Sequence, residues 1–131
     1  MKPRLVADTA CCSTISDLLS RVGDKWTILV VRALGRQPMR FNELRREIGD
    51  ISQKMLAQTL RHLERDGFVR RTVTPASPPK VDYALTPLGA DFLIPVCALA
   101  GWAERHVGQI TKARESYDRR QGADLTMEPV Q

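Results

Sequence analysis

Long apolar runs are missing from this sequence. The longest mainly apolar stretch, Phe92 to Trp102, is well short of the roughly 20 residues that a helix needs to cross a bilayer. Nothing at the N-terminus resembles a secretory signal peptide. We therefore expect a cytoplasmic protein with no membrane partner.

The sequence patterns of the common enzyme classes are missing as well. There is no Gly-rich phosphate loop, no His–Glu metal motif and no nucleophile elbow. The two histidines, His62 and His106, have no partner residues at the spacing of a metal site. We expect neither an enzyme nor a bound metal or cofactor.

Cysteine is scarce, and its spacing excludes two further classes of site. Cys11 and Cys12 are adjacent and Cys97 stands alone, so the three suit neither a disulfide framework nor a C-x-x-C metal pair. We expect reduced thiols. Because Cys97 falls within the apolar stripe of the last expected helix, we expect it to be buried and unreactive.

A length of 131 residues predicts one domain with a single hydrophobic core. The chain has 20 Lys and Arg against 15 Asp and Glu, and the segment from Arg40 to Lys80 has nine against five. Most of the positive surplus therefore lies in one segment. Such a local surplus fits a polyanionic partner such as nucleic acid, although it does not require one.

The segment from Ser52 to Asp66 predicts one amphipathic helix with two different faces. Leu56, Leu60 and Leu63 follow the i, i+4, i+7 spacing of a buried stripe. The opposite side is basic and amide-rich, and carries Lys54, Gln58, Arg61 and Arg65. One face is expected to pack on the core, which leaves the other free to bind.

A second, shorter helix is expected just before it, from Asn42 to Ile48. Gly49 and Asp50 break that helix. Ser52 is then a natural N-cap for the longer helix, and Ile51 with Leu56 would form a hydrophobic staple at its start. Two helices joined by a tight Gly-containing turn predict a helix-turn-helix.

A β-hairpin is expected after the longer helix. Gly67 is placed to end that helix in a left-handed conformation, and Phe68 to Thr74 and Val81 to Leu85 have the composition of strands. The loop from Pro75 to Lys80 is rich in proline and cannot join a strand ladder. Met39 and Arg40 could form one very short strand. The predicted fold class is mainly α with a small β-hairpin wing (α+β), a winged helix-turn-helix.

Further helices are expected on both sides of this unit. Apolar residues recur at helical spacing from about Ser13, although Gly23 could divide that stretch into two helices, and Gly35 is expected to end it. Thr86, followed by a proline, is the expected N-cap of a long last helix that Pro95 should kink.

The last helix has a broad apolar stripe and little core left to cover, so a second copy of the chain is its expected partner. The residues expected at this dimer interface are Ile15, Leu18, Leu93, Val96, Leu99, Ala100 and Ala103. The expected organisation is a flexible arm over residues 1–12, a DNA-binding and dimerisation domain over 13–116, and a polar, disordered tail over 117–131.

In a winged helix the recognition helix lies in the major groove with its N-terminal residues at the base edges. The residues expected to contact DNA are Ser52, Gln53, Lys54, Ala57, Gln58 and Arg61 on that helix, with Arg40, Arg71 and Lys80 on or near the wing. Gln pairs well with adenine, and Arg or Lys with guanine. The competing interpretation is that the cations form only a solvated helix face, and Arg70 could be a phosphate contact or a surface charge.

Four motifs in the same order resemble the HxlR family of bacterial transcriptional regulators, winged-helix proteins related to the MarR type. The motifs are Gly23 to Leu29, Arg40 to Arg46, Ile51 to Leu56, and Leu85 to Gly89, within a resemblance that covers roughly Cys12 to His106. The resemblance implies a homodimer that binds a pseudo-palindromic operator in double-stranded DNA and usually represses a nearby gene.

Many members of the family carry a cysteine just ahead of the first helix that senses electrophiles or oxidants. Cys12 lies near that position, with Cys11 beside it, so the resemblance implies a redox-sensing role for one of them; inert thiols are the competing interpretation. A different functional class also stays open, namely a winged helix that docks another protein or senses a small-molecule effector, with DNA binding secondary.

Overall fold

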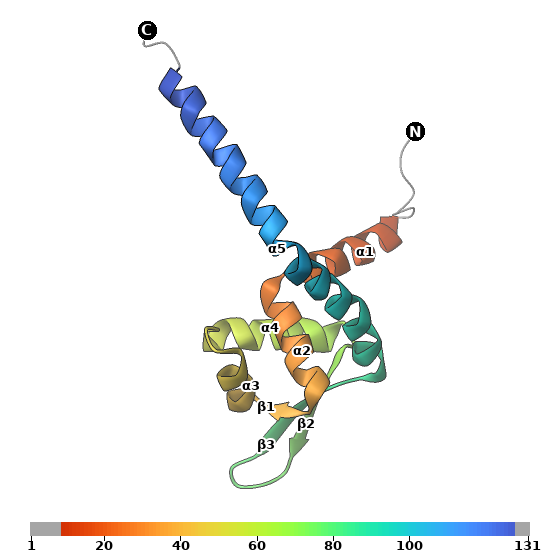
Figure 1. The fold of residues 1–131 in the computed structure, drawn as a ribbon. Helices are drawn as coiled ribbons and strands as arrows, with labels where there is room; N and C mark the ends of the chain where they lie inside the picture. The colour runs from red at the N-terminus through yellow and green to blue at the C-terminus, as the bar shows by residue number, and fades with distance from the viewer. Residues whose placement is uncertain (1–8, 128–131) are drawn as a thin grey trace. The chain divides into compact units, whose positions relative to one another are not determined.

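The computed structural model describes residues 9–127, and the side chains of residues 13–123. Its elements are α1 (Thr9–Val22), α2 (Lys25–Arg36), β1 (Met39–Arg40), α3 (Phe41–Ile48), α4 (Gln53–Arg65), β2 (Val69–Thr74), β3 (Lys80–Leu85) and α5 (Pro87–Met127). The chain divides after Cys97 into two compact units, so α5 contributes its first part to one unit and the rest to the other. The fold is mainly helical with one small sheet, as predicted (Figure 1).

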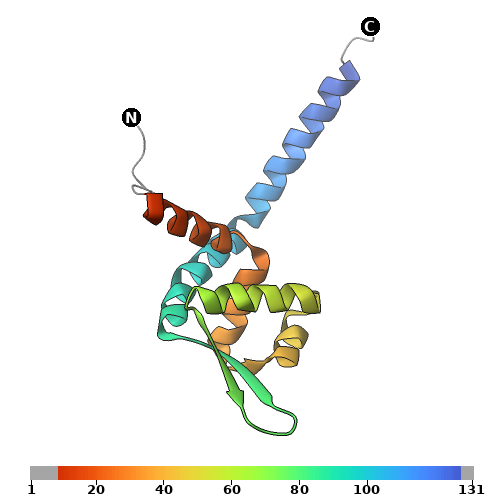
Figure 2. The same ribbon diagram turned by 180° about the vertical axis from the view of Figure 1, so that it is seen from behind.

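The core of the first unit lies between α2, α4, the sheet and the start of α5. Its fully buried side chains include Val30 and Val31 of α2, Leu56 and Leu63 of α4, and Val96 of α5. Helices α2 and α4 cross one another in both views (Figures 1 and 2). Burial of an aliphatic side chain of this size stabilises a fold by about 1.5–3 kcal/mol, so the leucine stripe of α4 fixes that helix on the core.

Helices α3 and α4 form the predicted helix-turn-helix. Gly49 ends α3 with a φ of 96°, a left-handed value that a residue with a Cβ rarely adopts. Ser52 caps α4, since its Oγ accepts a hydrogen bond of 3.0 Å from the backbone N–H of Met55. Ile51 and Leu56 are both buried, as expected for a hydrophobic staple. The turn therefore fixes the angle at which α4 leaves α3.

The end of α4 leads directly into the wing. Gly67 has a φ of 84°, and the backbone N–H groups of Gly67 and Phe68 donate to the carbonyls of Glu64 and Leu63 at 3.1 and 2.9 Å. This pair of bonds is a Schellman motif, which satisfies carbonyls that the helix end would leave free. The predicted left-handed helix end at Gly67 is confirmed.

The wing is an antiparallel hairpin in a sheet with the strand order β1-β3-β2. The register pairs Val69 with Leu85 at the base of the hairpin and Thr74 with Lys80 at its far end. The two-residue strand β1 adds to the other edge of β3, as the sequence predicted. Figure 1 shows the hairpin projecting beyond helices α2, α3 and α4.

Thr86 closes the base of the hairpin. Its backbone N–H donates to the Phe68 carbonyl at 3.0 Å, and its hydroxyl donates to the Gly67 carbonyl and accepts from the Gly89 N–H at 3.0 Å. The predicted N-cap role of Thr86 is therefore confirmed. The same residue joins the start of α5 to the end of α4, and we call these three hydrogen bonds the Thr86 clasp.

Helix α1 is tied to the end of the recognition helix by an ion pair. Arg21 Nε lies 3.4 Å from the Oδ2 of Asp66, although the alignment does not make a hydrogen bond, and both side chains are largely buried. The carboxylate of Asp66 lies at the C-cap of α4, where the helix dipole disfavours negative charge. Arg21 offsets that charge.

The start of α2 settles an alternative that the sequence left open, and its end differs from the prediction. Gly23 separates two distinct helices, α1 and α2, which resolves the alternative that the sequence left open. Gly35 does not end α2, which continues to Arg36, so the predicted stop is wrong. A Cβ at Gly35 would lie 2.5 Å from a methyl group of Leu93. A side chain at this position would therefore force Leu93 to shift, because α5 packs closely against α2.

The ends of the described helices also differ from the expected domain boundaries. Helix α1 begins at Thr9, within the segment expected to be a flexible arm, and α5 continues to Met127, through most of the segment expected to be a disordered tail. The residues beyond 117 are polar, but many are good helix formers, and they continue a helix that has already nucleated. No helix in the described part of the chain is long and apolar enough to span a membrane.

The second unit is the helical segment of α5 from Ala98. The rings of Trp102 and His106 stack with centroids 4.3 Å apart, and His106 Nδ1 lies 2.7 Å from the Trp102 carbonyl. Leu99 and Trp102 are 45% and 48% exposed. This helix therefore presents large apolar side chains to solvent.

Candidate nucleic-acid interface

The outer face of α4 is exposed and carries the predicted reading residues. Ser52, Gln53, Lys54, Gln58 and Arg61 are exposed, and Ala57 is partly exposed. Among the described residues, neither Lys54 nor Arg61 has an ion-pair partner. Exposed amides, and cations without an ion-pair partner, are the side-chain groups that contact phosphates and base edges in a DNA groove.

We predict that Ser52→Ala destabilises the fold by about 1 kcal/mol, because it removes the side-chain acceptor of the Met55 N–H at the start of α4. The loss should appear as a lower midpoint in thermal or denaturant unfolding. Ser52→Asp is the matched control, since it keeps an acceptor and should retain most of the stability. Equal stability of the Ala variant and the wild type would contradict the capping role.

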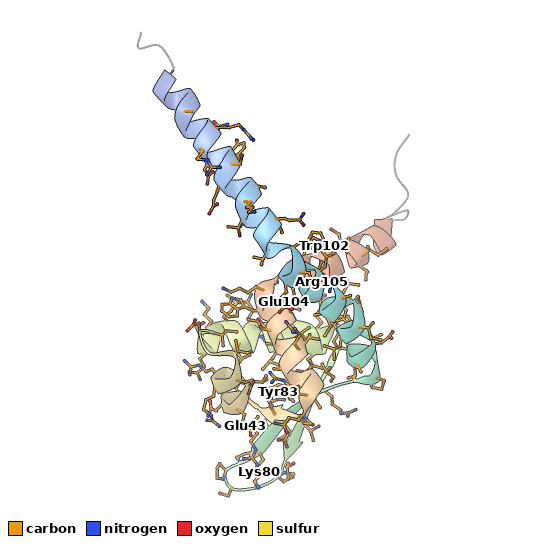
Figure 3. The ribbon with its side chains drawn as sticks, in the orientation of Figure 1. Glu43, Lys80, Tyr83, Trp102, Glu104 and Arg105 are labelled. Carbon is orange, nitrogen blue, oxygen red and sulfur yellow. The ribbon has the colours of Figure 1, made fainter. Side chains whose placement is uncertain are left out.

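The wing carries the other predicted cations. Arg71 and Lys80 are exposed, and Lys80 lies at the loop end of the hairpin (Figure 3). Arg40 is also exposed, and its Nε lies 3.7 Å from Asp82 Oδ1 of β3. An exposed ion pair of this kind contributes only about 0–1 kcal/mol, so Arg40 can exchange Asp82 for a phosphate at little cost.

A crevice separates α4 from the hairpin, and two of the residues that line it were not predicted from the sequence. Ala57, Leu60, Arg61 and Glu64 line it from the helix, and Arg71 and Tyr83 line it from the strands. Tyr83 and Glu64 were missed because strand composition marks Tyr83 only as a β-former, and Glu64 has the wrong charge for DNA. The cross-strand register, which places Tyr83 opposite Arg71, is the signal that could have found Tyr83.

The residues predicted at a dimer interface fall into different environments. Val96 is fully buried in the core of its own chain, so its assignment to the interface is wrong. Leu18 and Leu93 are partly buried against the same core. Ile15 and Ala100 are partly exposed, and Leu99 and Ala103 are exposed. Of the predicted set, Ile15, Leu99, Ala100 and Ala103 keep exposed surface and are not packed against the core of the first unit.

One of the three cysteines differs from expectation. Cys97 was predicted to be buried, but it is exposed, because it follows the buried Val96 and points to another side of α5. Cys11 and Cys12 belong to α1, but the structure describes only their backbone and not their side chains. In the described residues, no group of three His, Cys, Asp or Glu is placed to hold a metal ion.

The comparison with known families decides what these elements belong to. A family model described as an HxlR-like helix-turn-helix matches residues 21–111, which includes α2, the helix-turn-helix, the wing and the first part of α5. The chain belongs to the HxlR family. Members of this family are helix-turn-helix transcriptional regulators, not enzymes, so the resemblance noted in the sequence is confirmed.

Individual relatives agree with the HxlR assignment. The HTH-type transcriptional regulator YtfH of Escherichia coli (strain K12) is 43% identical over 99 residues, which cover 76% of this chain and 79% of that protein. The solved structure of the transcriptional regulator ytfH from Salmonella typhimurium is 44% identical, with a TM-score of 0.70 and coverage of 76% and 89%. The redox regulator HypR in its reduced form is 34% identical, with a TM-score of 0.69 and coverage of 76% and 98%.

Proposed function

We propose that this HxlR-family chain binds a pseudo-palindromic operator in double-stranded DNA as a homodimer and represses a nearby gene. The observation that carries the proposal is the two-sided recognition helix α4. Its leucines are buried in the core, whereas its amides and cations face solvent beside a projecting wing. Such a helix fits the major groove, with the wing reaching a flanking minor groove or the backbone.

Exposed apolar side chains support the homodimer. Leu19 of α1 is 60% exposed, and Leu99 and Trp102 of α5 are 45% and 48% exposed. Large apolar side chains that face solvent favour burial by a second copy of the chain, and a two-fold dimer uses the same surface on both subunits. Two recognition helices related by that axis would meet half-sites about 34 Å apart, one turn of the duplex.

Salt dependence tests the proposal against the alternative of a protein-docking or ligand-sensing module. We expect the chain to bind the DNA next to its own gene, with an affinity that falls roughly 10³- to 10⁵-fold between 50 and 200 mM salt if the dimer neutralises six to ten phosphates. Fluorescence anisotropy with labelled duplexes measures this slope. Binding to a protein partner through an apolar contact would lack it, and no preference for any duplex would refute the regulator proposal.

A redox response is a second proposal, supported by the similarity to HypR, which is named as a redox regulator. Cys11 and Cys12 lie in α1, the helix that Arg21 ties to the end of α4. A nearby positive group or helix N-terminus lowers the pKa of a thiol in general and makes it reactive. A shift of about 1–2 Å between two subunits is enough to misplace one recognition helix relative to the other.

The test must separate these thiols from the exposed Cys97. In a Cys97→Ser background, we expect alkylation or oxidation of Cys11 or Cys12 to weaken operator binding by about fivefold to 150-fold, the usual range of coupling between two sites. The same treatment of a variant that also carries Cys11→Ser and Cys12→Ser is the control and should change nothing. Unchanged affinity after complete modification of Cys11 and Cys12 would remove the sensing role.

A further inference from the structure

The crevice between the recognition helix and the wing has the chemistry of an anion site. It encloses about 340 Å³ between the flank of α4 and the paired strands β2 and β3. Two arginines, Arg61 and Arg71, line it together with a single acidic residue, Glu64. The charged groups of the crevice therefore sum to a net positive charge, and they come from two separate elements.

Tyr83 supplies a neutral donor on the same wall. It lies directly opposite Arg71 in the register of β2 and β3, so both side chains emerge on one face of the hairpin. Its ring is partly buried and packs against the core, and Figure 3 shows it nearer the helices than Lys80 is. Among the residues that the structure describes, no hydrogen-bond partner meets the Tyr83 hydroxyl, and neither Arg61 nor Arg71 has an ion-pair partner.

The position of the crevice indicates which anion it would bind, namely a phosphate of the DNA backbone. In a duplex, one phosphate backbone separates a major groove from the next minor groove. A protein that places α4 in the first and its wing in or near the second must therefore straddle that backbone. The crevice lies between these two elements. Guanidinium groups pair with phosphate oxygens through two parallel N–H donors, and a phenol donates one more bond.

We propose that this crevice binds a single phosphate of the operator backbone, held jointly by Arg61 of the recognition helix and by Arg71 and Tyr83 of the wing. This inference rests on the DNA-binding function proposed above and deepens it. It assigns Arg61 to the phosphate backbone, whereas the sequence alone predicted a contact between Arg61 and the base edges. A phosphate held from both sides would lock the angle between α4 and the hairpin when DNA is bound.

Glu64 also lines the crevice, and its negative charge would oppose an anion bound there. Glu64→Gln should therefore tighten DNA binding, whereas Arg71→Gln and Tyr83→Phe should weaken it. Tyr83→Phe keeps the ring that packs on the core and removes only the hydroxyl. Arg70 is the matched control for Arg71, since it is the preceding residue of β2, pairs with Ala84 and lies on the opposite face of the hairpin.

The experiment uses the full chain and a duplex selected by it from a random-sequence pool. Fluorescence anisotropy would measure binding of the wild type, Tyr83→Phe, Arg71→Gln, Arg70→Gln and Glu64→Gln, after thermal melts show that each variant is folded. We expect losses of about tenfold for Tyr83→Phe and Arg71→Gln, little change for Arg70→Gln and a gain for Glu64→Gln. The salt slope of Arg71→Gln should fall by about two, one for each subunit of the proposed dimer.

A second set of duplexes, with one neutral methylphosphonate moved along the backbone, locates the phosphate. At one position in each half-site, the neutral group should weaken DNA binding by the wild type. It should have little further effect on binding by Tyr83→Phe or Arg71→Gln, because these variants already lack a side-chain group that contacts that phosphate. If the effects add at every position, or if Arg71→Gln behaves like Arg70→Gln, the crevice is not a phosphate site although the regulator proposal stands. If no duplex is selected at all, the proposed function itself fails.

Discussion

Replacing Gly89 by Ala is expected to destabilise the fold by about 3 kcal/mol or more. A Cβ at this position would lie 2.0 Å from the Phe68 carbonyl oxygen and 2.9 Å from its carbon. Both are backbone atoms, so no side-chain rotation can relieve the clash. The start of α5 would have to move away from the end of α4, which would break the Thr86 clasp. Thermal unfolding should show a midpoint lower by roughly 10 °C or more.

Gly23→Ala is the control for this substitution. A Cβ at Gly23 would meet only the Ser20 and Leu19 carbonyl oxygens at 3.7 and 3.8 Å, which are ordinary contacts. Its unfolding midpoint should stay within a few degrees of the wild type. A Gly89→Ala variant as stable as Gly23→Ala would mean that α4 and α5 are not joined as tightly as the clasp requires.

Replacing Lys54 by Ala should remove much of the choice between operator and unrelated DNA. Lys54 is exposed near the N-terminus of α4, the part of a recognition helix that reaches base edges. Loss of a Lys–guanine contact removes about 1–3 kcal/mol of discrimination, or roughly fivefold to 150-fold in the ratio of the two affinities. Anisotropy with the selected duplex and with a scrambled duplex measures this ratio.

Arg65→Ala is the control that distinguishes the loss of base recognition from the loss of one positive charge. It removes the same unit of charge from the last turn of α4, about 16 Å further along the helix. We expect it to weaken binding to both duplexes alike and to leave their ratio unchanged. Sedimentation of both variants should show the oligomeric state of the wild type. Full specificity in Lys54→Ala would refute the assigned reading face.

The local structure was predictable wherever one residue type has one physical role. Ser52 caps α4, Gly67 adopts the left-handed conformation and Thr86 caps α5, and each follows from backbone hydrogen bonds that a helix end leaves unsatisfied. The prolines between Pro75 and Pro79 could not pair in a ladder, so the hairpin and its loop also followed from the chain alone. These local rules give the winged helix without any knowledge of the core.

Contacts between elements distant in sequence were not predictable in this way. Gly35 was expected to stop a helix, but its actual role depends on Leu93 of α5. Val96 was expected on an interface because it belongs to an apolar stripe, and the stripe alone does not show which of its residues the chain's own core buries. Tyr83 joins Arg61 only through the crevice between α4 and the hairpin, which no periodicity reveals.

The Thr86 clasp has one further consequence, for the length of the wing. Both ends of the hairpin are fastened at the same place, since the strand that leaves Phe68 returns to Thr86 and is bonded to the Phe68 and Gly67 carbonyls there. Extra residues inserted in the loop between Pro75 and Pro79 would therefore extend the reach of the hairpin along the duplex. They would not change the spacing of α4 and α5 at the base of the hairpin. The length of the wing can therefore change independently of the helices that support it.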